Sequence, residues 1–148
     1  MDRLEERRPE VIRYVVDASS VGPLLLRDEA ANAVAEIARS LERGECIVPA
    51  HWRFEVANML LVAERAGRVD AETVLADLAD FDEFPVEIDF ASLGSAWSPT
   101  YELARQHKLT IYDAAYLELA HRRSLILISL DRRLLRAARA EGVEAIGP

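Results

Sequence analysis

The sequence contains a single cysteine, Cys46, so it can form neither an internal disulfide nor a cysteine-based zinc site. No apolar run is long enough to cross a membrane, because Asp, Glu or Arg interrupts each one. The charged N-terminal stretch lacks the apolar segment of a signal peptide. We therefore expect a cytoplasmic protein without membrane association, in which Cys46 is a small buried residue beside Ile47 and Val48.

Asp and Glu number 26 against 18 Lys and Arg, and Lys108 is the only lysine. The net charge of −8 argues against a protein that binds nucleic acid through its overall charge. Arg132, Arg136 and Arg139 nevertheless follow an i, i+4, i+7 spacing that places them on one helical face. This face could bind RNA phosphates, since Arg suits bidentate phosphate contacts. The alternative is a solvated face paired with nearby acids such as Glu141.

Short apolar stretches alternate with helical patterns along the 148 residues. Strands are predicted at residues 13–17, 46–48, 86–88, 125–129 and 143–146, and helices at residues 21–27, 31–42, 51–66, 70–82, 90–107 (with a break near Gly94 and Pro99), 111–122 and 131–141. This alternation predicts an α/β fold with three layers, α/β/α, around a short, mainly parallel sheet. Residues 1–12 are expected to form a polar extension, and residues 13–148 one domain.

Two helices have a predicted apolar face. In helix 51–66 the apolar positions include Phe54, Ala57 and Leu61. Helix 70–82 is expected to turn its apolar side chains inward, namely Val74, Leu75, Leu78 and Phe81. Ser19 and Ser20 are predicted to cap the helix that follows the first strand.

Four acids stand where parallel strands end or helices begin. Asp17 ends the first predicted strand, and Asp131 comes just after the fourth. Asp113 and Glu55 lie in the first turns of two helices. Because ligand sites in such sheets lie at the carboxyl ends of the strands, all four could meet at one edge. Each also has a plainer interpretation: a helix cap for Asp113 and Asp131, a turn for Asp17, and a solvated helix position for Glu55.

Clustered carboxylates raise one another's pKa values and destabilise a fold unless a cation lies among them. Ligand sets made only of oxygen atoms favour Mg²⁺ or Mn²⁺ over zinc. One or two such ions could activate water and stabilise the attacking and leaving oxygens in phosphate chemistry. The four acids therefore indicate a magnesium- or manganese-dependent hydrolase as the leading hypothesis.

Four sequence blocks that carry these acids resemble the motif blocks of PIN-domain proteins, and in particular VapC-type toxins. The blocks are YVVDASSVGPLLL (residues 14–26), PAHWRFEVANMLL (49–61), LTIYDAAYLELA (109–120) and LISLDRRLLRAARAEGV (127–143). The resemblance implies endonucleolytic RNA cleavage that depends on Mg²⁺ or Mn²⁺. It also implies a homodimer, and inhibition by a cognate antitoxin protein whose C-terminal segment lies across the active-site groove.

The resemblance also assigns individual residues. It implies that Asp17, Glu55, Asp113 and Asp131 bind metal, and that Ser19, Asn58 and Ser129 support them. Ser129 stands where the family commonly has Thr, which keeps the hydroxyl group. Some relatives have a further acid after the Asp131 position, where this chain has two arginines, so the number of metal ions is left open.

Three other interpretations compete with this one. A catalytically silent PIN-like module that binds RNA or protein is disfavoured because all four acids are present. A receiver-like signalling domain would need an acid after the strand at Ile47-Val48, where Pro49 stands instead. A hydrolase with Asp17 as nucleophile would need a second acid two residues later, where Ser19 stands.

Overall fold

The central sheet contains five strands that all run parallel. The computed structural model of the protein describes residues 10–26 and 39–148, and its strands lie in the order β3-β2-β1-β4-β5. Their bounds are Arg13–Val16 (β1), Glu45–Pro49 (β2), Val86–Asp89 (β3), Ile126–Ile128 (β4) and Ala145–Ile146 (β5). The predicted parallel sheet is confirmed, and β5 is an edge strand beside β4 as expected.

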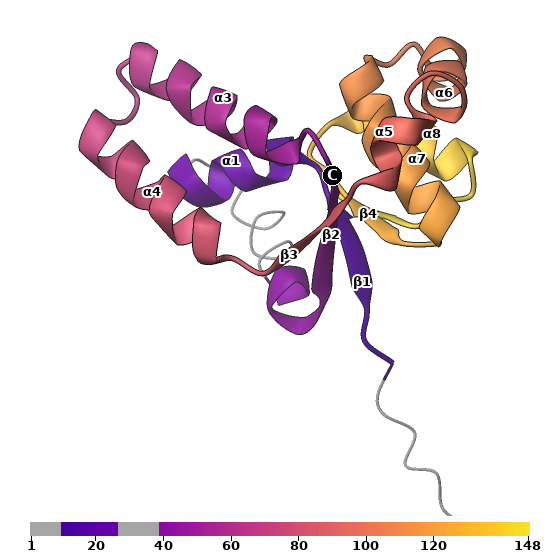
Figure 1. Cartoon of the computed structure of the whole chain (residues 1–148), viewed down its shortest axis with the longest axis horizontal. Coiled ribbons are helices and arrows are strands. Elements are labelled where there is room, and N and C mark those ends of the chain that lie inside the picture. Colours follow the sequence, from indigo (N-terminus) through magenta and orange to yellow (C-terminus); the bar gives the residue numbers. More distant parts are fainter. Residues whose placement is uncertain (1–9, 27–38) are drawn as a thin grey trace, which may run out of the picture.

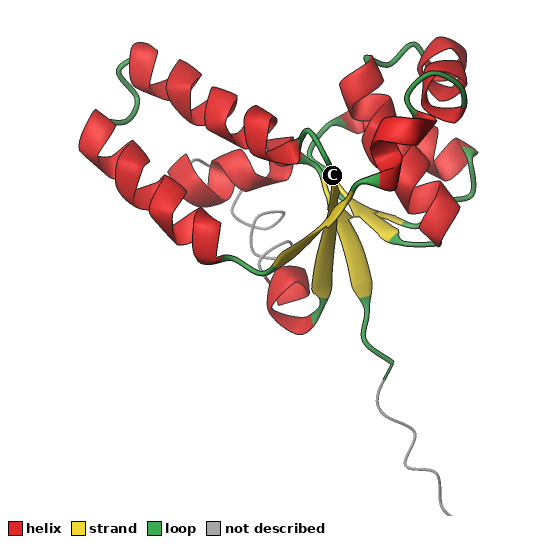
Figure 2. Ribbon diagram, viewed as in Figure 1, coloured by secondary structure: helices red, strands yellow, loops and turns green. Residues whose placement is uncertain are grey.

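Helices cover both faces of this sheet, which confirms the three-layer prediction (Figures 1 and 2). One layer holds α1 (Ala18–Leu26), α3 (Trp52–Arg65) and α4 (Ala71–Glu83). The other layer holds α5 (Ala91–Ser95), α6 (Pro99–His107), α7 (Ile111–Arg123) and α8 (Arg132–Ala140). Of the helix predicted at residues 31–42, residues 39–42 are helical and the rest lies outside the described residues. No helix in the described part of the chain is both long and apolar enough to span a membrane.

The three inner strands are buried on both faces, which explains why they read as continuous apolar runs rather than alternating ones. Val15, Ile47, Val48 and Leu127 are at most 1% exposed. Cys46 is buried among them, as predicted, and burial raises the pKa of its thiol to about 11. The core therefore fixes the strand register, and with it the residues that follow each strand.

Several helix ends follow from local chemistry. Asp70 caps α4, because its Oδ1 accepts a hydrogen bond from the Thr73 amide at 2.7 Å. Pro99 opens α6 after the predicted break. Gly142 follows α8 with a φ of +73°, a conformation that glycine adopts without strain. The predicted cap at Ser19 and Ser20 is wrong, since α1 already begins at Ala18.

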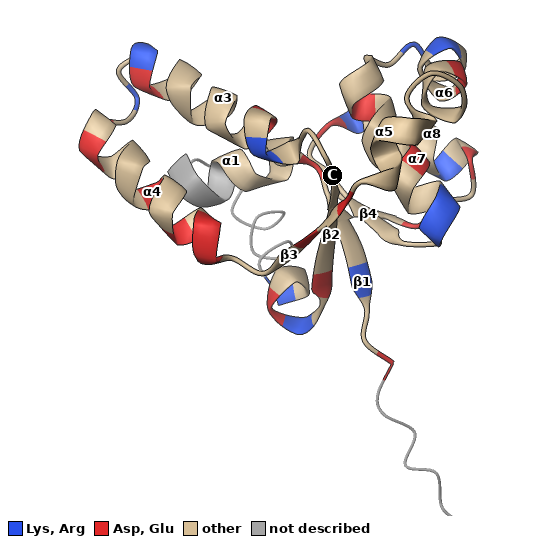
Figure 3. Ribbon diagram, in the orientation of Figure 1, with Lys and Arg blue, Asp and Glu red and all other residues tan. Residues whose placement is uncertain are grey.

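The apolar positions named from the sequence of α3 are not the ones that it buries. Phe54 is 81% exposed and Leu61 is 38% exposed, whereas the buried residues of α3 are Trp52, Val56, Leu60 and Ala63. Both sets satisfy a helical period because apolar residues nearly surround this helix. In α4, Val74 is buried and Leu78 and Phe81 are partly buried as expected, but Leu75 is exposed. The outer surface of α4 is acidic (Figure 3).

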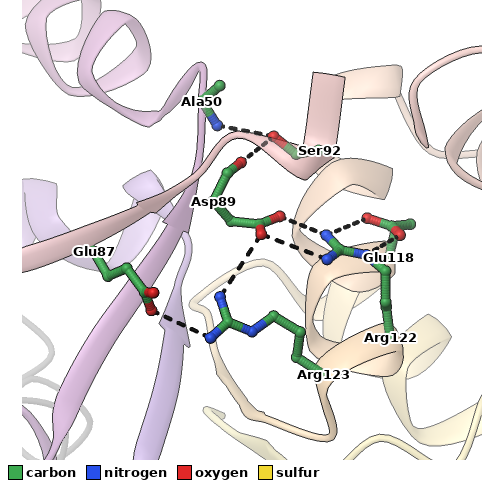
Figure 4. A network of polar contacts seen from close by, with 7 residues as sticks. All are labelled: Ala50, Glu87, Asp89, Ser92, Glu118, Arg122 and Arg123. Carbon is green, nitrogen blue, oxygen red and sulfur yellow. Dashed lines mark hydrogen bonds and ion pairs between the residues drawn. The ribbon is translucent and has the colours of Figure 1, made fainter. Parts of the chain in front are cut away.

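A network of charged side chains joins the end of β3 to α7 (Figure 4). The Arg122 guanidinium contacts the carboxylates of Asp89 and Glu118, which are only 7% and 4% exposed. Arg123 lies 3.3 Å from Glu87 and 3.7 Å from Asp89. Ser92 donates to the Asp89 carbonyl and accepts from the amide of Ala50, which links this network to the end of β2. The network fixes the layer that carries α7 against the sheet.

Candidate active site

Asp17 is placed by the pairing of β1 with β4. Val16 lies opposite Ile128, so the next residues, Asp17 and Ser129, meet at the carboxyl edge of the sheet. Ser129 Oγ donates to Asp17 Oδ2 at 2.7 Å, and Ser19 Oγ donates to the same oxygen at 2.6 Å. Asp17 is only 2% exposed. Burial raises the pKa of Asp17, and the hydrogen bonds from Ser19 and Ser129 oppose this rise.

Glu55 reaches the same edge from the first turn of α3. Its Oε1 accepts a hydrogen bond from the Tyr116 hydroxyl at 3.2 Å. Oε1 also lies 2.7 Å from His51 Nε2, an ion pair when the imidazole is protonated. The His51 ring packs against Tyr112 and Tyr116, with ring centroids 5.5 and 5.1 Å away. Glu55 therefore has a defined position between two helices of opposite layers.

Asp113 enters the cluster from the first turn of α7. Thr110 caps this helix, because its Oγ1 accepts a hydrogen bond from the Asp113 amide at 3.1 Å. The pKa of Asp113 is raised to about 6, first by burial and then by the negative charges of Asp17, Asp131 and Glu55. The other three acids are therefore close enough to Asp113 to raise its pKa.

Three of the four acids surround one point. Asp17, Glu55 and Asp113 each offer a carboxylate oxygen, and these oxygens lie within 4.8 Å of one another. Asp131 is not a member of this group. Its Oδ1 accepts hydrogen bonds from the amides of Arg133 at 2.8 Å and Leu134 at 3.3 Å, so it caps α8. Its plainer interpretation as a cap is confirmed, and the expected direct role in the cluster stays a prediction.

The donor set fits a divalent cation. All three ligands are carboxylate oxygens, the type that Mg²⁺ and Mn²⁺ prefer. The pKa of Asp113 is raised by burial first and then by repulsion from the neighbouring acids, and a cation would relieve that repulsion. Ser19 and Ser129 hold Asp17 in place, and Tyr116 holds Glu55, so the oxygens that face the centre are already oriented.

A family model described as PIN domain matches residues 14–140, which is most of the chain. The chain belongs to the PIN-domain family. It is similar to Ribonuclease VapC3 of Mycobacterium tuberculosis, with 35% identity over 127 residues that span 84% of this chain and 87% of the relative. It is also similar to Ribonuclease VapC3 of Pyrobaculum aerophilum, with 30% identity over 83% of this chain and 92% of that protein.

Solved structures of PIN proteins share the fold. PAE2754 from Pyrobaculum aerophilum aligns with a TM-score of 0.66 and 25% identity, over 92% of this chain and 89% of that one. VapC20 of Mycobacterium tuberculosis, a toxin that cleaves the sarcin-ricin loop, aligns with a TM-score of 0.60 and 16% identity, over 84% of this chain and 94% of that one. The resemblance deduced from the four sequence blocks is thereby confirmed, along with its fold.

The remaining residues that the sequence proposed for this PIN domain differ in their surroundings. Ser19 and Ser129 contact Asp17 directly, as described above. Asn58 is exposed on α3, one turn after Glu55, and its supporting role stays a prediction. Arg132, Arg136 and Arg139 are exposed on α8, and among the described residues none of them forms an ion pair. Glu141, which the sequence suggested as a partner of these arginines, instead places its Oε1 atom 2.6 Å from His107 Nε2.

Two residues of the site were missed in the sequence. His51 and Tyr116 both contact Glu55, and neither is among the residues proposed from the sequence. Spacing could have indicated both, because His51 lies one turn before Glu55 and Tyr116 one turn after Asp113. Tyr116 is fully buried, whereas Tyr112 is 61% exposed.

Proposed function

We propose that this PIN domain is the toxin of a toxin–antitoxin pair, an endoribonuclease that hydrolyses RNA phosphodiester bonds with Mg²⁺ or Mn²⁺. The three carboxylates of Asp17, Glu55 and Asp113 around one point carry this proposal. The VapC ribonucleases at 30–35% identity support the reaction class. The domain is proposed to extend over residues 13–148, with residues 1–12 as an extension, and to act in the cytoplasm.

The side chains of the site have separate tasks in this proposal. Asp17, Glu55 and Asp113 hold the cation. Ser19 and Ser129 keep the Asp17 carboxylate oriented through hydrogen bonds of 2.6 and 2.7 Å. Tyr116 keeps Glu55 in place from the opposite layer. A bound divalent cation would supply acidification of a water molecule and neutralisation of the phosphate charge.

Asp131 supports the site from its position as the cap of α8. Its amide donates to Ser129 Oγ at 2.9 Å, the same hydroxyl that donates to Asp17. Ser129 therefore connects the start of α8 to the acid cluster. Catalysis in this arrangement comes mainly from positioning and from charge stabilisation, since no nucleophilic side chain is required.

The proposal is tested with purified protein, tRNA and other structured RNAs, with Mg²⁺ or Mn²⁺ present or removed by EDTA. We expect cleavage that EDTA abolishes, and that Asp17→Asn and Asp113→Asn reduce at least 100-fold, in the range reported for the loss of one key electrostatic group. Asp80→Asn on the exposed face of α4 is the matched control and should keep full activity. Cleavage that survives EDTA or both substitutions would contradict the metal mechanism.

The silent binding module remains the alternative, and the same assay separates it from the enzyme, since it predicts RNA binding without cleavage. An antitoxin and a homodimer are also part of our proposal. Co-expression with the product of a short neighbouring reading frame should restore growth of cells that express the toxin. The mass of the purified protein in solution should be twice that of the 16.6 kDa chain.

A further inference from the structure

A hollow of about 520 Å³ lies between the end of α6 and α8. Its lining residues are His107, Lys108, Arg133, Arg136, Ala137 and Ala140. Three of them are Lys or Arg, in a protein whose net charge is −8. The alanines of α8 leave space between these long side chains. The hollow therefore gathers positive charge on a surface that is acidic elsewhere, for example on α4 (Figure 3).

The positive charges of this hollow have no acidic partner in the part of the chain that the structure describes. Among these residues, no carboxylate forms an ion pair with Lys108, Arg133 or Arg136. Arg122 and Arg123, by contrast, form ion pairs with acids of the sheet and α7 (Figure 4). The three cations of the hollow could therefore bind an anion from outside the protein.

Two acids lie near the hollow, and neither forms an ion pair with Lys108, Arg133 or Arg136. The carboxylate of Glu141 lies 2.6 Å from His107 Nε2. The carboxylate of Asp131 accepts hydrogen bonds from the backbone amides of Arg133 and Leu134. Both carboxylates therefore contact other groups of the protein.

The hollow adjoins two of the acids that the sequence singled out. Lys108 comes two residues before Thr110, which caps the helix that carries Asp113. Arg133 comes two residues after Asp131, and its amide donates to the Asp131 carboxylate. At 1.5 Å of rise per residue, Arg133 and Arg136 lie roughly 3 and 8 Å along α8 from Asp131. Lys108, Arg133 and Arg136 therefore lie close in the chain to Asp113 and to Asp131, the acid that caps α8.

We propose that Lys108, Arg133 and Arg136 bind the backbone phosphates of the RNA strand whose scissile bond lies at Asp17, Glu55 and Asp113. This inference rests on the proposed ribonuclease function and adds a substrate-binding site to it. It also revises the sequence-based assignment, because of the predicted set Arg132, Arg136 and Arg139 only Arg136 lines the hollow.

An RNA backbone fits this surface better than an acidic protein segment does. A cluster of carboxylates repels a polyanion, so a strand can reach it only if neighbouring phosphates are neutralised nearby. Phosphates recur at every nucleotide, and the cations form a short series along α8 and the end of α6. Arg also binds phosphate oxygens in pairs through its planar guanidinium.

The test measures how RNA binding depends on salt. A fluorescein-labelled single-stranded RNA is titrated by anisotropy between about 50 and 200 mM KCl, at constant Mg²⁺, with protein that carries Asp17→Asn to suppress cleavage. The variant under test combines Lys108→Gly, Arg133→Gln and Arg136→Gln. Lys108 has a φ of +55°, which glycine adopts more easily, so its replacement removes the charge without straining the backbone. Gln keeps a good helix propensity in α8.

The control removes the same charge elsewhere, through Arg39→Gln, Arg43→Gln and Arg65→Gln, which are exposed residues outside the hollow. For single-stranded nucleic acid each phosphate contact contributes about 0.7 to the slope of log K against log salt. We expect the slope to fall by about 2 in the hollow variant and to stay unchanged in the control. A fall of about 2 in this slope corresponds to RNA binding by the hollow variant that is roughly 100-fold weaker at 0.1 M salt.

Each outcome bears on the proposal. An unchanged slope, or an equal loss in the control, would overturn it. So would weaker binding of an oligo-glutamate peptide with unaltered RNA binding, which would assign the hollow to an acidic protein. If the triple variant unfolds at a lower temperature, the three single substitutions are used, each with an expected slope change of about 0.7. Failure of the protein with Asp17 intact to cleave RNA would refute the proposed function and leave this binding result standing.

Discussion

Replacement of Asp113 by Asn is expected to make the metal-free protein more stable at neutral pH, while it removes a proposed metal ligand. The pKa of Asp113 is raised from 3.8 to about 6 by burial and by the charges of Asp17, Asp131 and Glu55. A carboxylate with a raised pKa binds its proton more tightly in the folded state than in the unfolded chain. Its favourable contribution is therefore complete below pH 3.8 and is lost as the pH rises through about 6.

The size of this effect follows from the shift. About two pKa units correspond to about 3 kcal/mol. Asp113 is only partly buried, so solvent screening reduces this to roughly 1–2 kcal/mol. Asn keeps a side-chain group that can hydrogen-bond to Thr110 at the start of α7. For a chain of this length the gain corresponds to a rise in Tm of roughly 3–6 °C.

The measurement is thermal unfolding of the wild type and Asp113→Asn in EDTA, at pH 4, 6 and 8. We expect equal stability near pH 4 and a growing advantage of the variant up to pH 8. Added Mg²⁺ or Mn²⁺ should reverse the order, because a ligand stabilises the form that binds it better. The reasoning is refuted if the variant melts below the wild type in EDTA at pH 8, or if both respond to pH alike. Asp80→Asn is the control for loss of one negative charge.

Three further results are expected. Arg122→Met should lower the free energy of unfolding by about 3 kcal/mol in urea, because it leaves the buried carboxylates of Asp89 and Glu118 without their partner; an unchanged midpoint would contradict the stabilising role of the network. Ser129→Ala should weaken Mn²⁺ binding by 10- to 100-fold in calorimetry, since Asp17 loses a donor, whereas Ser129→Thr should restore it; equal affinities in all three proteins would refute that role. Cys46, with a pKa of about 11 and a buried side chain, should react with a disulfide reagent at pH 8 only after unfolding, and rapid reaction of the native protein would show that this strand opens.

The sequence predicted the features that depend on neighbouring residues or on general rules of sheet topology. Apolar runs located all five strands, and the rule that sites lie at carboxyl ends brought Asp17 and Asp113 to one edge. The contact between Asp17 and Ser129 follows from the register of β1 and β4, because each residue comes directly after one of two paired strand residues. These features were predictable because each depends on a single strand end or helix start.

Features that depend on packing were not predictable. In α3 two apolar faces were available, and the sheet and the neighbouring helices decided that Val56 would be buried and Phe54 exposed. The network around Arg122 joins residues 33 positions apart, and none of its members stands out in the sequence. Asp131 carries two compatible signals, since an acid before a helix can be a cap or a ligand, and only its hydrogen bonds show that it caps α8.

The contact between Tyr116 and Glu55 has a consequence for the order in which the protein becomes active. It joins the two helical layers across the sheet edge. Neither layer alone therefore contains all the acids of the site and all the side chains that hydrogen-bond to them. During synthesis Asp17 and Glu55 leave the ribosome early, whereas Asp113, Tyr116 and Ser129 leave it late. The strand β1 lies between β2 and β4, so the centre of the sheet is incomplete until β4 has been synthesised. An incomplete nascent chain therefore lacks part of the acid cluster, and the complete site can form only once nearly the whole chain has been translated.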